Sequence, residues 1–396
     1  MISPAEAEAA VRARASRLPE AMLPLQELAG AVLRESIVAT RDQPPFDRVT
    51  MDGIAFAISS VGRRAFRIVG VQPAGAAPLA LSEPDACLEV MTGASLPIGC
   101  DCVIPVEKIT VRDGVAHLAD DAKPSRGLNI HARGLDVRRG EPLLNAGTRL
   151  GPAEIAVLAS NGLTHACVTR PPRIVVVSTG NELIEPGRAV EDWQIYRSNA
   201  HGVIAALQRR GFHSLAQDHL PDDLPALRAR LQAHLDAYDI LILSGGVSMG
   251  RFDYVPQALA ELGVSVVFHK IAQRPGKPMW FGVGENGTTV YALPGNPVST
   301  LMCLLRYVFP GLESALGAAP SSPESVALLE DFEVKPPLTF FLPVKLSRDG
   351  ERLCAIPQPT RGSGDFVSLI GADGFVELPP GPQRVKRGAR VPLYRW

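Results

Sequence analysis

The spacing of apolar and polar positions changes along the chain, and each change predicts a different kind of structure. Residues 3–18 are amphipathic and begin with Ser3-Pro4, which predicts an N-terminal helix. The apolar positions of residues 25–40 predict a second helix with one buried face. Between residues 41 and 140, short apolar runs such as FRIVGV, CLEVMTG and DCVIPVEKITV are separated by Gly and Pro, which predicts a β-rich region.

After the pair Pro171-Pro172, apolar runs alternate with amphipathic stretches. The predicted strands read RIVVVS, HSLAQDHL, DILILS, SVVFHKI, MWFGV and VYAL. A helix is expected before this pair at residues 151–161, and after it helices are expected at residues 198–210, 224–237, 254–262 and 298–316. Such alternation is typical of a parallel sheet covered by helices on both faces. Beyond the linker AAPSSPES, short strands return, so residues 326–396 are expected to form a small all-β domain.

Length and composition narrow the class of protein. With 396 residues, 46% of them hydrophobic, the chain can bury several cores and suggests about two to four domains. Lys and Arg total 40 and Asp and Glu total 41, which argues against a broad nucleic-acid-binding surface. The N-terminus lacks the apolar core of a signal peptide, and no apolar run reaches transmembrane length. We therefore expect a soluble cytoplasmic protein with no nucleic-acid or membrane partner.

The six cysteines are scattered and form no zinc motif or disulfide framework, so we expect them to be structural or incidental. GVGENG matches the dinucleotide-binding fingerprint, but it joins two predicted strands and therefore reads as a hairpin turn. RPGKP lacks the spacing of a phosphate-binding P-loop. No Ser-His-Asp arrangement follows from the spacing of the eight histidines.

Residues suited to binding and catalysis are concentrated in three loops that follow predicted strands, in the stretches VVVSTGNEL, LILSGGVSMGRFD and YALPGNPVS. In open α/β sheets, ligands bind outside the carboxyl ends of the strands, so these loops should meet. They offer Ser, Thr, Gly and Asn donors, and carboxylates come from Glu182, Asp253 and Asp222. Donors combined with carboxylates suit a phosphate ligand bound through Mg²⁺. The alternative is that each loop is an ordinary helix cap.

The third loop brackets Gly295-Asn296 with Pro294 and Pro297. A rigid turn at a helix start can point free N–H groups at an anion, but the two prolines can equally mark an ordinary loop between a strand and a helix. Just past another strand, Lys270, Arg274 and Lys277 form a cationic group that either holds an anionic ligand or is a solvated basic loop.

These loops, in this order, resemble a known family. Together with VTMDG, VMTGASLPIGCDCVIPVE, GLNIHARGLD, YRSN and HKIAQRPGKP, they are similar to the motifs of molybdopterin molybdenumtransferases and the related E domains of gephyrin. The resemblance spans essentially the whole chain. It implies molybdenum cofactor biosynthesis: adenylylated molybdopterin and molybdate are converted to the cofactor with release of AMP, assisted by Mg²⁺. Anion donors, cations and metal-holding carboxylates suit that chemistry.

The resemblance also implies a multidomain α/β plus β fold in an elongated homodimer. The expected parts are an N-terminal helix (1–19), an elongated dimer-forming segment (20–40 and 140–170), an inserted β-rich domain (41–139), a three-layer α/β domain with a mainly parallel sheet (171–318) and a C-terminal β-barrel (319–396). The active cleft would lie between the α/β domain of one subunit and the β-rich domain of the other. Other cofactor-synthesis proteins and recipient molybdoenzymes would be partners.

Matching motifs imply the following site. The catalytic carboxylates would be Asp52, Asp136, Glu182, Asp222 and Asp253, of which Glu182, Asp222 and Asp253 would hold the metal. Molybdate or phosphate would be bound by Lys270, Arg274 and Lys277. The remaining substrate-binding positions would be Thr92, Thr179, Ser198, Ser244, Gly245, Gly246, Ser248, Pro294, Gly295, Asn296 and Pro297. Asp52, Thr92 and Asp136 would come from the facing subunit.

The chain departs from the family pattern at several positions. Leu135 stands where the family commonly has Glu, and Arg274 where it has Lys. In the last domain a common Arg is replaced within PPLTFFLP, whereas Gly362-Ser363 is retained. Two other readings remain: a molybdopterin adenylyltransferase, which the α/β segment also resembles, and a non-catalytic cofactor carrier or scaffold, which the change at Leu135 favours.

Overall fold

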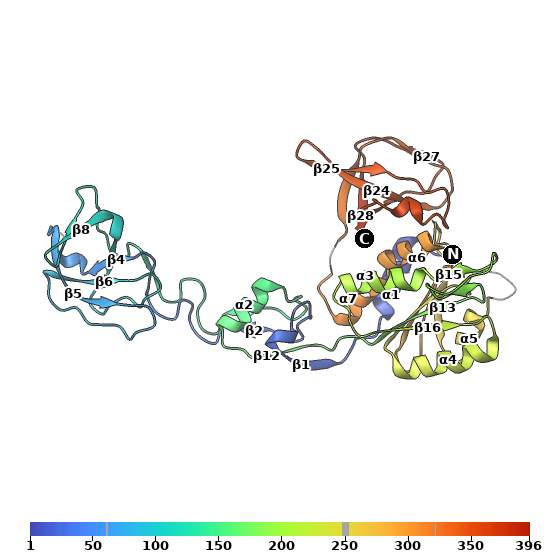
Figure 1. Ribbon diagram of the computed structural model, residues 1–396, viewed down its shortest axis with the longest axis horizontal. Helices are drawn as coiled ribbons and strands as arrows, with labels where there is room; N and C mark the ends of the chain where they lie inside the picture. The colour runs from blue at the N-terminus through green and yellow to red at the C-terminus, as the bar shows by residue number, and fades with distance from the viewer. Residues whose placement is uncertain (61, 248–252, 321) are drawn as a thin grey trace. The chain divides into compact units, whose positions relative to one another are not determined.

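The computed structural model describes residues 1–60, 62–247, 253–320 and 322–396, so the predicted site residue Ser248 lies outside the described residues. The chain divides into two units (Figure 1). One comprises residues 1–34, 147–151 and 165–396, and the other comprises residues 35–146 and 152–164. The finer division into five segments stays a prediction.

The first unit is built on a six-stranded sheet in the order β16-β13-β17-β21-β20-β18. Four neighbouring strands run parallel: β16 (Leu215–Leu220), β13 (Ile174–Thr179), β17 (Ile240–Ser244) and β21 (Thr289–Leu293). The other two, β20 (Trp280–Val283) and β18 (Ser265–His269), pair antiparallel. The prediction of a mainly parallel sheet is confirmed. The antiparallel edge arises because GVGENG is a hairpin turn, as expected, and sends β21 back along β20.

Alternate residues along the central strands face two helical layers. On β13, Ile174 and Val176 pack toward one layer, and Val175 and Val177 toward the other. The first layer contains α1 (Pro4–Arg14), α3 (Asn199–Arg209), α6 (Pro297–Cys303) and α7 (Phe309–Leu316). The second contains α4 (Leu224–Ala237) and α5 (Val255–Glu261) (Figure 1). All these strand residues are fully buried, as expected for a sheet covered on both faces.

The prediction of a helix at residues 25–40 is wrong. The chain instead forms β1 (Glu20–Pro24), a short 3₁₀ turn (Leu25–Glu27) and β2 (Ile37–Val38). Here β1 pairs with β12 (His165–Thr169), and β2 pairs with β11 (Pro142–Leu144). Leu28 is buried at the end of the 3₁₀ turn, and Val32 and Leu33 are buried in bridges to Arg149 and Val168. Gly30, between them, has a positive φ of 79° that breaks helical geometry. Pairing with distant residues therefore overrides the local helical pattern.

The second unit is β-rich, as predicted. Its main sheet has the order β7-β4-β6-β5-β9-β8. The strands are β4 (Gly53–Phe56), β5 (Ala65–Gln72), β6 (Ala86–Val90), β7 (Cys102–Pro105), β8 (Ile109–Arg112) and β9 (Val115–Leu118). A two-residue pair, β3 (Arg48–Val49) with β10 (Ile130–His131), lies outside this sheet. The helix predicted at residues 151–161 is present as α2 (Pro152–Ser160).

The C-terminal region forms the predicted small β-barrel. Its strands are β22 (Glu324–Leu328), β24 (Thr339–Asp349), β25 (Arg352–Pro357), β26 (Gly374–Leu378) and β28 (Arg390–Arg395). The barrel closes because β24 pairs with both β25 and β26. A short strand of the α/β region, β19 (Gln273–Arg274), extends this sheet by pairing in parallel with β24. Across the described residues, no helix has the length and apolar character needed to cross a membrane.

The helix predicted at residues 298–316 is a continuous run in which a π-helical turn, Leu304–Val308, separates α6 from α7. This turn carries Arg306, whose buried guanidinium pairs with Glu8 of α1 and with Glu377 of β26 at 2.8 Å. Burial alone would raise the pKa of Glu8, but Arg306 and Arg12 lower it overall. One buried cation thus joins the N-terminal helix, the helical layer and the barrel.

Replacing this cation should destabilise the first unit. We expect Arg306→Met to lower the midpoint of thermal unfolding by roughly 5 °C or more, because it leaves two carboxylates without their buried partner. The matched control is Arg12→Met, whose pair with Glu8 is partly exposed and should change the midpoint by about 1 °C or less. Circular dichroism on both variants measures the difference, and equal midpoints would contradict the assigned role of Arg306.

Candidate active site

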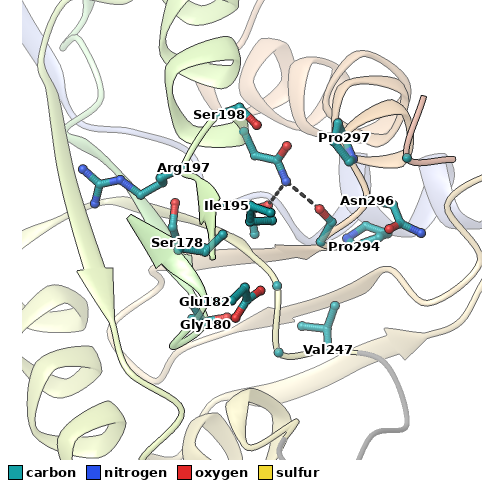
Figure 2. Close-up of a pocket in the computed structure, with 18 of the residues that line it drawn as sticks. Ser178, Gly180, Glu182, Ile195, Arg197, Ser198, Val247, Pro294, Asn296 and Pro297 are labelled. Carbon is teal, nitrogen blue, oxygen red and sulfur yellow. Dashed lines mark hydrogen bonds between the residues drawn. The ribbon is translucent and has the colours of Figure 1, made fainter. Parts of the chain in front are cut away.

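A pocket of about 660 Å³ lies at the carboxyl ends of three parallel strands of the first unit (Figure 2). The end of β13 and the loop after it contribute Ser178–Gly180, the end of β17 and the loop after it contribute Ser244–Val247, and the loop after β21 contributes Pro294–Pro297. These are the three loops that the sequence predicted would meet. Because the strands are parallel and adjacent, their carboxyl ends place the loops at one edge of the sheet.

Glycines allow the loops to approach closely at the pocket floor. Gly245 has a φ of 103°, and a Cβ added there would lie 2.7 Å from the carbonyl oxygen of Thr179. Gly246, with a φ of 66°, would bring its Cβ within 2.7 Å of a methyl group of Val255. Both the backbone conformation and the close packing therefore require glycine at these two predicted site residues.

Asn199, at the start of α3, ties two of the loops together. Its amide nitrogen donates to the hydroxyl of Ser244 at 2.9 Å and to the carbonyl of Gly295 at 2.7 Å (dashed lines in Figure 2). The motif YRSN contains this residue, but sequence reasoning assigned a role only to its neighbour Ser198, which also lines the pocket. The sequence analysis missed Asn199, since its role depends on loops far away in the chain.

Several buried polar atoms at the pocket have no hydrogen-bond partner among the described residues. They are the hydroxyls of Ser178 and Thr179 and the amide oxygen of Asn199. Ser178 is only 1% exposed and Thr179 only 4%. Leaving a buried polar atom unpaired costs free energy, so such atoms mark places where a ligand or water completes the bonding. The pocket is therefore equipped to bind a polar ligand.

Three carboxylates, Glu182, Asp222 and Asp253, line the pocket, as the sequence predicted. Burial raises the pKa of Asp222 above its ordinary value, and the charges of Glu182 and Asp253 raise it further. The backbone N–H of Asp222 is held by the side chain of Asn181. No set of three His, Cys, Asp or Glu side chains among the described residues is close enough to enclose a metal ion by itself.

The predicted cationic group lies apart from this pocket. Arg274 and Lys277 line a second pocket of about 650 Å³, between the α/β region and the barrel. Two further cations there come from the barrel, Lys335 and Arg361, together with one carboxylate, Glu333. Lys270 is absent from the described linings of both pockets. The cationic turn thus forms its own site with help from the C-terminal domain.

The two pockets are neighbours. Pro278, Pro294 and Asn296 line both of them. A barrel loop completes the shared wall, because the Ser363 hydroxyl accepts from the Asn296 amide at 2.7 Å, and Gly364 lines the first pocket. The N–H of Val298, at the start of α6, donates to the Ser363 carbonyl at 3.1 Å. The first N–H after the Pro-Gly-Asn-Pro turn is therefore bonded to the barrel and is not left for an anion.

The other predicted site residues belong to the second unit. Asp52 accepts hydrogen bonds from the backbone N–H and hydroxyl of Thr92 at 2.6 and 2.7 Å, and these bonds lower its pKa. Asp136 lies 2.8 Å from Nε2 of His131, whose Nδ1 lies 3.1 Å from Arg48. The sequence analysis assigned no role to this histidine. The second unit thus contains two small polar clusters: Asp52 with Thr92, and Asp136 with His131 and Arg48.

Comparison with known proteins identifies the family. Three family profiles match the chain: the MoeA N-terminal region (domains I and II) at residues 2–162, a probable molybdopterin binding domain at residues 175–314, and the MoeA C-terminal region (domain IV) at residues 325–396. A molybdopterin molybdenumtransferase of Synechocystis is 40% identical over the full length of both chains. One of Staphylococcus epidermidis is 30% identical, covering 92% of this chain and 88% of its own.

Solved structures agree with this result. Two structures of the molybdopterin biosynthesis MoeA protein from Pyrococcus horikoshii superpose on the whole chain. Their TM-scores are 0.80 and 0.83, with 30% and 25% sequence identity, and 99% and 100% of those chains are covered. The family resemblance drawn from the loop motifs is thus confirmed. The chain belongs to the molybdopterin molybdenumtransferase family, whose members are MoeA-type enzymes.

Proposed function

We propose that this chain catalyses molybdenum insertion in molybdenum cofactor biosynthesis, taking molybdenum from molybdate into adenylylated molybdopterin and releasing AMP. The observation that carries the proposal is the pair of neighbouring pockets. One offers polar loops and carboxylates, the other offers four cations, and they share the wall of Pro278, Pro294 and Asn296. A reaction between a phosphorylated organic molecule and an oxyanion needs two such subsites side by side.

The first pocket would hold the adenylylated substrate. The unpaired atoms of Ser178, Thr179 and Asn199 would bond to polar groups of the pterin or the phosphates. Gly245 and Gly246 let the loop Ser244–Gly246 pack closely against Thr179 and Val255, so the loop would form the floor beneath the phosphates, while the N–H of Gly245 stays bonded to the Leu293 carbonyl. Ser198 and the turn Pro294–Pro297 would form the walls, and Ser248, outside the described residues, stays a predicted substrate-binding position.

The carboxylates would hold Mg²⁺ against the phosphates. Magnesium keeps several waters and commonly takes one or two carboxylates plus substrate phosphates, so no closed set of three protein ligands is needed. Asp222 with Glu182 or Asp253 would supply those ligands. The raised pKa of Asp222 fits this role, because crowded negative charge favours a cation. Bound there, the metal would neutralise charge on the departing AMP phosphate.

The second pocket would bind molybdate. Arg274 and Lys277 would hold the oxyanion together with Lys335 and Arg361, while Lys270, outside the described lining, would add positive charge from the residue after β18. Arg presents a planar fork of donors, and Lys presents a compact charge. Both can bind a tetrahedral anion, so Arg274 preserves the function of the family's usual lysine with a changed geometry.

Asp52, Thr92 and Asp136 would complete the site from a second copy of the chain in a homodimer. They lie in polar turns of the second unit, where the short bonds from Thr92 hold Asp52 in its ionised form. An ionised carboxylate held in an exposed turn is ready to act on a ligand supplied from elsewhere. Among the other readings, the carrier or scaffold is favoured by Leu135, which is exposed where the family commonly has an acid.

Reconstitution tests the proposed function directly. We expect purified protein with adenylylated molybdopterin, Mg²⁺ and molybdate to release AMP and form active cofactor, and both products to disappear when molybdate is omitted or Mg²⁺ is chelated. Binding of the substrate without either product would identify a carrier. Conversion of molybdopterin and ATP to the adenylylated form would identify an adenylyltransferase instead.

Asp222 should contribute to activity at a cost to stability. Its raised pKa means that the folded protein holds the proton more tightly than the unfolded chain does, so ionisation at neutral pH opposes folding. The resulting loss of folding free energy is absent well below pH 4, develops as the pH rises through the raised pKa of Asp222, and persists at higher pH. We expect Asp222→Asn to lower AMP release at least about 100-fold while leaving the unfolding midpoint unchanged or higher.

The matched control is Asp223→Asn at the next residue. The Asp223 carboxylate caps α4 by accepting from the N–H of Ala226, and Asn caps helices about as well. Activity and unfolding midpoint should therefore both stay close to those of the original protein. A drop in the midpoint of Asp222→Asn would show that its carboxylate has a structural role.

Mixing two inactive variants tests whether a site is shared between subunits. We expect Asp52→Ala and Asp253→Ala each to fold normally and lose turnover. After equal amounts are unfolded and refolded together, half of the dimers should contain one intact site, which restores roughly a quarter of the original activity. No recovery would mean that both residues act within one subunit.

A further inference from the structure

A buried polar chain lies directly beneath the cationic turn Arg274–Lys277. Gln273 is 0% exposed, although an amide is costly to bury unless its polar atoms are bonded. Its amide oxygen accepts from the hydroxyl of Tyr307, which is also fully buried. Its amide nitrogen donates to the Pro275 carbonyl at 3.2 Å and lies 3.5 Å from the sulfur of Cys303. Both ends of the amide are therefore satisfied.

The turn Arg274–Lys277 packs tightly against the side chains of Gln273 and Cys303. Gly276 has a φ of 91°, and a Cβ added there would lie 2.6 Å from the Gln273 amide nitrogen and 2.7 Å from the Cys303 sulfur. The Cys303 thiol also reaches the Gly276 carbonyl at 3.7 Å. Two consecutive carbonyls of the turn thus point inward onto Gln273 and Cys303. The charged side chains on either side, Arg274 and Lys277, are exposed in the second pocket.

Packing alone does not explain a glutamine here. Leu or Met would fill a similar volume without burying an amide, so the amide is present for its hydrogen bonds. Burial raises the pKa of Tyr307 far above its ordinary value, which keeps the hydroxyl protonated and able to donate. Tyr307 lies on the π-helical turn Leu304–Val308, and such turns often occur at functional sites.

We propose that Gln273 and Tyr307 are positioning residues for the anion site: Tyr307 orients the Gln273 amide, and that amide fixes the turn so that Arg274 and Lys277 point into the second pocket. This inference rests on the proposed function only in naming molybdate as the anion. Tyr307 is absent from the described lining of the second pocket; Gln273 lines it, but its amide is already bonded to Tyr307, Pro275 and Cys303, so we assign it to holding the turn rather than to binding the ligand. Their contribution is to remove the freedom of the turn before the anion arrives, which strengthens binding by preorganisation.

Two substitutions separate positioning from general stability. Tyr307→Phe removes only the hydroxyl, and Gln273→Met removes the amide at similar volume. We expect each to weaken molybdate binding roughly tenfold, the effect of losing one buried hydrogen bond. Maximal AMP release at saturating molybdate should stay within about twofold, and the half-saturating concentration of adenylylated molybdopterin should not change. Because the two groups act in series, the double variant should be little worse than either single one.

The matched control is Tyr291→Phe. Tyr291 is also 0% exposed and lies in the same core cluster, on β21, but it lines neither pocket among the described residues. Its hydroxyl should affect only the unfolding midpoint. Weakened molybdate binding in Tyr291→Phe equal to that in Tyr307→Phe would show a general loss of stability and overturn the positioning role.

Calorimetry with molybdate alone keeps this test independent of turnover. If the original protein binds molybdate but releases no AMP, the proposed reaction fails while the positioning role is still measured by the binding constants. Binding by folded Tyr307→Phe within about twofold of the original would overturn the inference. If Gln273→Met does not fold, Tyr307→Phe decides by itself, because it leaves the ring and its packing in place.

Discussion

The site depends on the parallel pairing of β13, β17 and β21. Because these neighbouring strands share one direction, their carboxyl ends deliver three separate loops to one edge of the sheet. The strands are mainly apolar, and all their residues are buried, including the polar ones at their ends, so the loops begin from rigid positions. Asn199 then fixes two of the loops relative to each other. Precise placement of the polar groups thus follows from a strand pairing that extends to the pocket itself, where Ser178 of β13 pairs with Ser244 of β17.

Much of this arrangement could be predicted from the sequence, since the α/β region encodes its elements locally. The span 224–237 was predicted as a helix and is α4, and the hairpin at residues 282–287 follows from its flanking strands. The helix predicted at residues 25–40 fails because its apolar residues pair with segments more than 100 positions away. Asn199 and Gln273 were missed for the same reason, because their partners come from distant segments. The local sequence pattern predicts the helices, the strands and the polar residues of the loops. Which side chains hold those loops in place depends on tertiary contacts, which the local pattern does not reveal.

The pocket also shows a conflict between stability and binding. Unpaired hydroxyls of Ser178 and Thr179 and the crowded carboxylate of Asp222 each oppose folding in the free protein. A chain selected for stability alone would replace them with paired or apolar side chains. Their retention is understandable if a ligand supplies the missing bonds and a cation supplies the missing charge. The same groups that weaken the free fold would then strengthen the complex.

The barrel has a larger part in this site than its sequence implied. The family's common Arg is replaced within PPLTFFLP, yet Lys335 and Arg361 bring cations to the second pocket from other parts of the barrel. The strand β19 pairs with β24, so the turn that bears Arg274 is itself joined to the barrel sheet. Arg306 fixes the same two regions together from within the helical layer. The wall of the second pocket is therefore held by contacts with the barrel and with the helical layer, and Lys335 and Arg361 supply positive charge there without the arginine that the family commonly has.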